Sequence, residues 1–224
     1  MRRLLRDALE KYPTPLRTHL DVACGTGLAM EFFRRQGWRS VGVDASLPML
    51  QVARRRAERL VAGDYRALPL RGTFARITCL YDSLNHLKDR VELAAAFRSI
   101  RRLMGPQSLL LFDMNHPDIY PAVWGMRDPF VASGADYRLE IATTYRKREG
   151  IGRALVTGWA VLADRTRVEI RERHEQRAYG EREIVEALAD AGLVPVEVVN
   201  FDPYDEAGTV DAKGVKLFFV CGVK

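Results

Sequence analysis

Long hydrophobic runs are absent from this chain of 224 residues. No stretch approaches the roughly 18 uncharged apolar residues that a membrane-spanning helix requires. The opening sequence, MRRLLRDALEKY, carries charges throughout and contains no hydrophobic signal region. We therefore expect no membrane segment and a cytoplasmic location.

Cysteine is also scarce, with three residues in the whole chain. Cys24, Cys79 and Cys221 lie far apart in the sequence, and none of them forms a closely spaced metal-ligand pair. Each lies in or beside an apolar run. We expect reduced, mostly buried thiols and no metal site.

Lysine is rare among the basic residues, since six of the 35 are lysine and 29 are arginine. The net charge is +6, and the densest basic run is Arg54 to Arg56 with Arg59. We expect this run inside a helix capped by Ser46, with the arginines on a solvated face. No aromatic residues alternate with them, so the charge does not favour nucleic acid as a partner.

One glycine is missing from the stretch Thr18 to Asp44, which otherwise reads as a nucleotide-binding unit. Its sequence, THLDVACGTGLAMEFFRRQGWRSVGVD, predicts a strand, a turn at Gly25 and Gly27, a helix, a second strand and a terminal acid. The helix N-terminus would direct its free N–H groups into the turn. A dinucleotide fingerprint needs glycine where Met30 stands, so that signal is broken.

Apolar strands alternate with helical segments as far as a fifth strand, expected at Ser108 to Phe112 after a helix at Lys88 to Met104. This alternation predicts an α/β fold, a doubly wound parallel sheet with helices on both faces. Three strand-like runs then follow, at 137–146, 152–162 and 166–178. They predict an antiparallel β insertion after strand five.

The expected domain organisation follows from this change of pattern. The α/β core should occupy residues 1–135 and 180–224, and the insertion residues 136–179. The second core segment should contain a helix and the last two strands.

The segment Asp21-Val22-Ala23-Cys24-Gly25-Thr26-Gly27, followed by Asp44 and then Ala45-Ser46-Leu47-Pro48-Met49-Leu50, resembles motif I of the class I S-adenosylmethionine (SAM)-dependent methyltransferases. This resemblance implies a Rossmann-like, mostly parallel seven-stranded sheet with SAM as the cofactor. The chain departs from the family at Ala23, where many relatives have glycine.

Four acids fall at predicted strand ends, namely Asp21, Asp44, Asp64 and Asp82. Ligands of open α/β sheets bind at the carboxyl ends of the strands, and carboxylates suit a ligand that carries a sulfonium and an ammonium. The resemblance implies that Asp44 accepts hydrogen bonds from both ribose hydroxyls and that Asp64 accepts from the adenine amine. It also implies that Asp21 orients the turn or the methionine ammonium, and that Asp82 lies near the methionine moiety or the substrate. Further expected cofactor contacts are Ala23, Cys24, Gly25, Gly27, Ala45, Gly63 and, at the adenine, Met49 and Tyr65.

The substrate side is indicated by two patterns, Glu172-x-His174-x-x-Arg177-x-Tyr179 and Phe112-Asp113-Met114-Asn115-x-Pro117. They look similar to a subgroup that includes glycine N-methyltransferase and the nucleotide-sugar N-methyltransferases. The resemblance implies an insertion that covers the active site or joins two subunits, so a homodimer is an open alternative. Expected substrate contacts are Asn85, His86, Asn115, Glu172 and His174.

The sequence leaves two interpretations of the role of His174 open. It could accept a proton from the acceptor during catalysis, or it could be a polar residue that pairs with Glu172 on the same strand face. Strand alternation puts both side chains on that face.

The function expected from the resemblance is in-line methyl transfer from SAM to a nitrogen or oxygen of a small-molecule acceptor. An RNA methyltransferase is one alternative, but the sequence after strand four is Asp82-Ser83-Leu84-Asn85, not an Asn- or Asp-Pro-Pro-Tyr motif. The other alternative is a protein that binds SAM without transferring its methyl group.

Overall fold

The computed structural model describes residues 1–162, 164–202 and 215–224, which divide into two compact units. The first unit comprises residues 1–84, 89–114 and 181–224, and the second comprises residues 85–88 and 115–180. The predicted division at residues 135 and 179 stays a proposal. No helix in the described ranges is long and apolar enough to cross a membrane.

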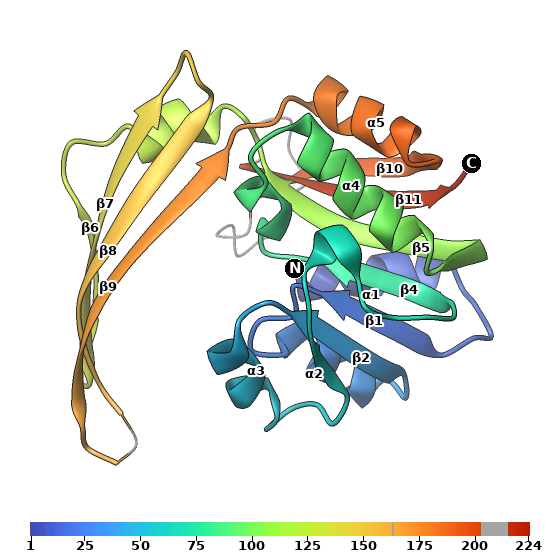
Figure 1. Cartoon of the computed structure of the whole chain (residues 1–224), viewed down its shortest axis with the longest axis horizontal. Coiled ribbons are helices and arrows are strands. Elements are labelled where there is room, and N and C mark those ends of the chain that lie inside the picture. Colours follow the sequence, from blue (N-terminus) through green and yellow to red (C-terminus); the bar gives the residue numbers. More distant parts are fainter. Residues whose placement is uncertain (163, 203–214) are drawn as a thin grey trace. The chain divides into compact units, whose positions relative to one another are not determined.

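The first unit contains a seven-stranded sheet in the order β10-β11-β5-β4-β1-β2-β3 (Figure 1). Its strands are β1 (Thr18–Val22), β2 (Arg39–Asp44), β3 (Leu60–Ala62), β4 (Phe74–Cys79), β5 (Met104–Asn115), β10 (Leu193–Phe201) and β11 (Lys216–Val223). β1 pairs in parallel with β2 and β4, β2 with β3, and β4 with β5, whereas β10 and β11 are antiparallel. The predicted mostly parallel, seven-stranded sheet is confirmed.

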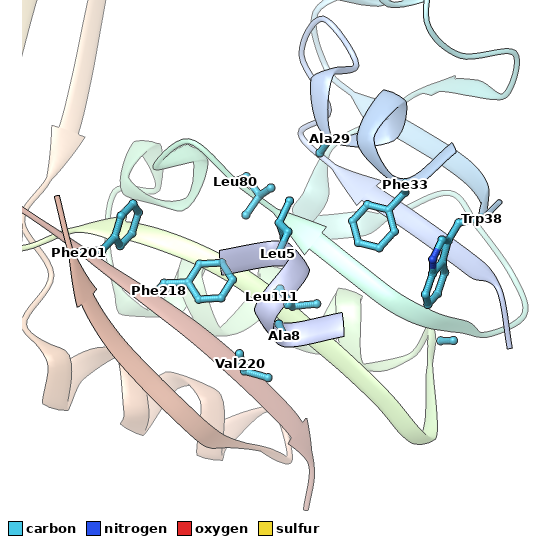
Figure 2. Close-up of a cluster of buried hydrophobic side chains, with 11 residues drawn as sticks. Leu5, Ala8, Ala29, Phe33, Trp38, Leu80, Leu111, Phe201, Phe218 and Val220 are labelled. Carbon is cyan, nitrogen blue, oxygen red and sulfur yellow. The ribbon is translucent and has the colours of Figure 1, made fainter. Parts of the chain in front are cut away.

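The helices of this unit lie on both faces of the sheet (Figure 1). They are α1 (Arg2–Lys11), α2 (Leu28–Arg35), α3 (Leu47–Ala53), α4 (Arg90–Arg101) and α5 (Glu181–Asp190), with the 3-10 turn η1 (Tyr65–Ala67). A second 3-10 turn, η2 (Ser83–His86), begins in this unit and ends in the other. Figure 2 shows Leu5 and Ala8 of α1 in one buried cluster with Phe33 of α2 and with Phe218 and Val220 of β11. The amphipathic spacing of the opening helix is therefore satisfied by this face of the sheet.

Three predicted boundaries in this unit are wrong. The helix predicted to reach Met104 ends at Arg101. β5 begins at Met104 and not at Ser108, because Phe74 of β4 already pairs with Met104. α3 ends at Ala53, so Arg54 to Arg56 lie in the following turn and not in the helix. The helix must end there because Leu60 of β3 pairs with Gly42 of β2, and the chain has to return to the sheet.

The second unit is a four-stranded antiparallel sheet in the order β6-β7-β8-β9. Its strands are β6 (Phe130–Gly134), β7 (Tyr137–Arg146), β8 (Ile151–Val161) and β9 (Arg167–Arg177). The antiparallel insertion after β5 is confirmed, but β6 was not predicted. Its sequence, FVASG, is short and holds three small residues, so it carries little strand signal.

A short π-helical segment, η3 (Tyr120–Trp124), packs on one end of this sheet. Tyr120 is buried, and its ring lies 5.5 Å from that of Trp124 and 5.7 Å from that of Tyr145. Gly152 of β8 allows this packing, because a Cβ there would lie 2.7 Å from the Trp124 ring. The segment was not predicted from the sequence.

Candidate functional site

The turn after β1 is built on left-handed backbone. Ala23, Gly25 and Gly27 have φ values of 53°, 53° and 82°, a region that glycine enters without steric cost. Gly27 is also the N-cap of α2, so the first N–H groups of that helix face the turn. Ala23 adopts a backbone conformation that favours glycine although it carries a Cβ.

Asp44, at the end of β2, holds this turn in place. Its Oδ2 accepts a hydrogen bond from the Gly25 N–H at 2.8 Å, and its Oδ1 accepts from the Ser46 N–H at 2.7 Å. Each carboxylate oxygen can accept a second hydrogen bond, so the carboxylate keeps capacity for ribose hydroxyls. The ribose role stays a prediction, and the structure adds a positioning role that the sequence did not indicate.

Arg56 is a second contact of the turn that sequence reasoning missed. Its guanidinium donates to the Thr26 carbonyl at 3.1 Å, and its Nε lies 3.5 Å from a Glu31 carboxylate oxygen. The turn after α3 directs this side chain toward α2. The prediction of a solvated arginine run is therefore wrong for Arg56.

Asp21 lies inside β1 and is buried. Its Oδ1 accepts a hydrogen bond of 2.6 Å from the Thr78 hydroxyl of β4. Burial raises the pKa of Asp21 to about 7, the Thr78 hydrogen bond opposes this rise, and the nearby Asp44 carboxylate adds to it. The ionisation of Asp21 therefore depends on its burial, on the Thr78 hydrogen bond and on the charge of Asp44.

Asp64 begins η1 and is half-exposed. Its carboxylate accepts from the Arg66 backbone N–H at 2.8 Å and from the Arg66 guanidinium at 2.6 to 3.0 Å. This hydrogen bond to Arg66 lowers the pKa of Asp64. An adenine amine would share the carboxylate with Arg66, and the adenine role stays a prediction.

The other predicted cofactor contacts surround these acids. Tyr65 follows Asp64, and burial raises the pKa of its hydroxyl. Gly63 permits a close approach of Pro69, because a Cβ would lie 2.8 Å from the proline ring. Cys24 is buried with a pKa raised to about 12 by desolvation, whereas Ala45 and Met49 are exposed.

Asp82 follows β4 and forms an ion-paired group that the sequence did not predict. Lys216, at the start of β11, places its Nζ 2.5 Å from Asp82 and 2.8 Å from the buried Asp113. The N–H groups of Tyr81 and Asp82, both with positive φ, donate to the Asp113 carboxylate at 2.5 and 3.2 Å. Burial raises the pKa of Asp113, and Lys216 opposes that rise. The one available signal was a lysine before the last apolar run.

The second unit brings together all five predicted substrate residues, namely Asn85, His86, Asn115, Glu172 and His174. Asn85 is buried, donates to the Arg177 carbonyl at 2.8 Å and accepts from the Asn115 N–H at 3.0 Å. The Asn115 amide donates to Gln176 at 2.9 Å. These two asparagines therefore use their amides to hold segment 85–88 and the end of β5 against β9.

His174 and His86 form the accessible part of this cluster. His174 Nε2 lies 3.1 Å from a Glu172 carboxylate oxygen, and the two imidazole rings are 6.2 Å apart. His86 Nδ1 lies 3.0 Å from the Glu175 carbonyl. The predicted pairing of His174 with Glu172 is present, and its catalytic role stays a prediction.

Comparisons with known proteins agree with this geometry. Residues 20–107 match the family model described as a methyltransferase domain, and this segment contains all the predicted cofactor contacts. A solved SAM-dependent methyltransferase from Clostridium acetobutylicum superimposes with a TM-score of 0.86 at 21% identity, covering 99% of this chain and 90% of that one. The fold is that of a class I SAM-dependent methyltransferase.

Two further proteins are similar to this chain. DesVI of Streptomyces venezuelae superimposes with a TM-score of 0.78 at 23% identity, over 99% of this chain and 89% of that one. A dTDP-3-amino-3,6-dideoxy-alpha-D-glucopyranose N,N-dimethyltransferase of Streptomyces fradiae is 33% identical over 96 residues, which are 42% of this chain and 38% of that protein. The aligned segments span about two fifths of the length of such curated relatives.

Proposed function

We propose that this methyltransferase domain binds SAM and transfers its methyl group to a nitrogen of a small molecule, such as an amino group on a nucleotide-linked sugar. The observation that supports this most directly is the set of acids Asp21, Asp44, Asp64 and Asp82. Asp44 ends β2, Asp64 and Asp82 follow β3 and β4, and Asp21 is the penultimate residue of β1, so the four belong to adjacent strands in the order β4-β1-β2-β3, beside the glycine turn. Parallel strands present such residues at one edge of the sheet, where ligands bind.

The chemistry of this edge fits the cofactor. SAM, when bound, supplies an electrophilic methyl group on a sulfonium. Asp44 would accept from the ribose hydroxyls, and Asp64 with Tyr65 would hold the adenine. Asp21 and Asp82 would place negative charge near the cationic methionine end, where it is attractive.

The chain needs no covalent intermediate for this reaction. Its residues would hold the acceptor nitrogen in line with the methyl carbon and exclude water, an effect worth up to about 7 to 11 kcal/mol. An amine acceptor that arrives protonated must lose a proton, and His174, oriented by Glu172 at 3.1 Å, is the group we propose to accept it. Such a base typically contributes about 10²- to 10⁴-fold.

Nitrogen is proposed over oxygen because several of the similar proteins are described as acting on aminosugars, although one relative, 31% identical over 157 residues, is described as a ubiquinone biosynthesis O-methyltransferase. The relative from Streptomyces fradiae is an N,N-dimethyltransferase of an aminosugar, and the solved structure of CalS10, 22% identical, is described as an amino pentose methyltransferase. No observation on the described residues favours RNA as the substrate.

The test has two stages. Calorimetry should first show binding of SAM and of its demethylated product, S-adenosylhomocysteine. Transfer of labelled methyl from SAM should then be measured to a dTDP-aminosugar, to the corresponding hydroxyl sugar and to total RNA. Transfer to the aminosugar alone supports the proposal. Binding without transfer to any acceptor would favour a SAM-binding protein, and transfer to RNA would replace the proposal.

His174→Ala tests the proposed base once an acceptor is known. We expect turnover to fall about tenfold or more with SAM affinity unchanged, because the variant removes a proton acceptor and not a cofactor contact. Wild-type turnover would contradict the role. Glu172→Gln is the companion variant, with a smaller loss expected because it removes an orienting contact only.

We further propose that the four-stranded sheet joins two copies of the chain. The face that carries Glu172 and His174 at β9 is apolar toward the β6 edge, since the register places Phe130 opposite Ile141, Ile141 opposite Val156 and Val156 opposite Glu172. The proposed contact uses the β6 and β7 part of this face. Phe130 is 65% exposed, an unfavourable position for a large aromatic ring in water. Sedimentation should give a dimer for the wild-type chain and a monomer for Ile141→Glu, with Ala142→Glu on the opposite face as the control. A monomeric wild type would overturn the proposal.

A further inference from the structure

A continuous chain of hydrogen bonds crosses three strands behind the glycine turn. Ser40 of β2 lies 3.0 Å from Nδ1 of His19 in β1, and Nε2 of His19 lies 2.9 Å from the Thr78 hydroxyl of β4. Thr78 in turn lies 2.6 Å from Asp21 Oδ1. His19, Thr78 and Asp21 are all buried, and Ser40 is half-buried.

These hydrogen-bonded side chains lie in a part of the sheet where burying a polar group without a partner costs free energy of folding. His19 stacks on Phe33 with ring centroids 3.6 Å apart, and Phe33 belongs to the apolar cluster drawn in Figure 2. Unpaired polar groups at such a place would cost stability. The four groups therefore have to satisfy one another, and the direction of each hydrogen bond follows from that of its neighbours.

Two arrangements satisfy every group. When Asp21 is a carboxylate, Thr78 donates to Asp21 and accepts from His19 Nε2–H, so His19 Nδ1 carries no proton and accepts from the Ser40 hydroxyl. When Asp21 holds a proton on Oδ1, the oxygen that contacts Thr78, it donates to Thr78, Thr78 donates to His19 Nε2, and His19 Nδ1–H donates to Ser40. One proton added to Asp21 thus reverses the direction of every hydrogen bond in this series, and it moves the His19 proton from Nε2 to Nδ1.

We propose that Ser40, His19 and Thr78 are positioning residues that couple the ionisation of Asp21 to the tautomer of His19, and so hold Asp21 as a carboxylate when a cationic ligand is bound. The inference rests on the proposed function in one respect, that Asp21 faces the cationic end of SAM. The tautomer change itself does not depend on the cofactor.

The surrounding groups are compatible with this two-state behaviour. Burial lowers the pKa of His19 to about 3, so the ring stays neutral near neutral pH and can change only its tautomer. The pKa of Asp21, about 7, lies where its two forms are both populated. The other titratable groups whose charges act on Asp21 or are acted on by it are Asp44, Cys24, Cys79 and Tyr81. The pKa values of both thiols and of the tyrosine are raised by burial, so they are neutral in this range.

The direct test is ¹⁵N NMR of the histidine-labelled, cofactor-free protein, which contains four histidines. The Ser40→Ala spectrum assigns His19, because it alters that ring alone. We expect His19 to be protonated on Nδ1 near pH 5 and on Nε2 near pH 8.5, with a midpoint at about pH 7. Thr78→Val should abolish this change, whereas Thr78→Ser should preserve it. A single tautomer of wild-type His19 over the whole range would overturn the proposal.

The second test is S-adenosylhomocysteine binding by calorimetry. Thr78→Val removes a hydrogen bond that favours the carboxylate, so we expect affinity about tenfold below wild type near pH 6 to 7 and equal to wild type near pH 9. Thr78→Ser should match wild type throughout. An equal deficit at every pH would indicate a purely structural role and contradict the coupling.

The NMR titration and the binding measurement test the tautomer coupling and the proposed function separately. If the wild-type protein binds neither SAM nor S-adenosylhomocysteine, the proposed function is wrong. The NMR titration of the cofactor-free protein still decides whether His19 and Asp21 are coupled. Cofactor binding with a pH-independent His19 tautomer removes the coupling alone.

Discussion

In the seven-stranded sheet, His19 and Asp21 of β1 and Thr78 of β4 are buried and hydrogen-bonded to one another, whereas in the four-stranded sheet polar side chains lie exposed along whole strands. β1 and β4 bury nearly every residue, while β7 alternates between exposed and half-buried positions. Parallel strands covered on both faces have no solvated side. A polar group there must find a protein partner, and its loss should therefore cost far more than the loss of a polar group in β7 to β9.

The largest effect is expected from Lys216→Met, which tests the buried side of this contrast. The variant removes the Lys216 ammonium from Asp82 and from the fully buried Asp113. We expect a loss of about 3 to 5 kcal/mol in the free energy of unfolding, measured with urea near neutral pH. The loss should shrink in acid, because protonated Asp113 needs no cation.

Lys216→Arg is the matched control and should recover most of the lost stability. If Lys216→Met lowers the free energy of unfolding by no more than the loss of an exposed ion pair does, burial does not determine the contribution of this ion pair to stability.

The second effect concerns Asp21 and its pH dependence. Its folded pKa of about 7 lies above the ordinary value of 3.8, so the folded state binds more protons than the unfolded state between these values. Stability from this group is therefore present below about pH 4 and lost as the pH rises to about 7, by up to about 4 kcal/mol. Asp21→Asn should remove this slope, so that its stability relative to wild type increases with pH. Parallel stability curves for the two proteins would contradict the assignment.

A smaller effect is expected at Asp44, on the partly solvated edge of the same sheet. Asp44→Ala should weaken SAM binding by about 1 to 3 kcal/mol, because it removes the predicted acceptor of the ribose hydroxyls. The variant also frees the Gly25 and Ser46 N–H groups that Asp44 holds. Unfolding measurements are therefore needed beside calorimetry, and unchanged affinity would rule out the ribose role.

The smallest effect is expected in the four-stranded sheet. Arg153 and Glu175 are paired at 2.7 Å across β8 and β9, and both side chains are exposed. Solvent screens such pairs, so Arg153→Gln should leave the urea midpoint unchanged. A shift comparable to that of Lys216→Met would erase the contrast between the two sheets.

Much of the fold and part of the candidate site could be predicted from local sequence. Gly25 and Gly27 indicated a turn, Ser46 with Pro48 indicated a helix start, and Ser46 does accept a hydrogen bond from the Met49 N–H. Alternation of apolar and polar residues predicted β7, β8 and β9 to within a residue or two. These signals are local, since a capping residue and a strand period act over a few neighbouring positions.

The sequence by itself therefore determined the order of strands and helices, the glycine turn and the acids that follow the strands. Only the tertiary structure decided their partners. Lys216 reaches Asp82 across 134 positions, and Thr78 reaches Asp21 across 57. No short-range pattern encodes such pairs, because they form only when the sheet places distant strands side by side. The same holds for Asp44. The sequence predicted an acid at the end of the second strand, but the hydrogen bond between its carboxylate and the Gly25 N–H arises from the pairing of β1 with β2.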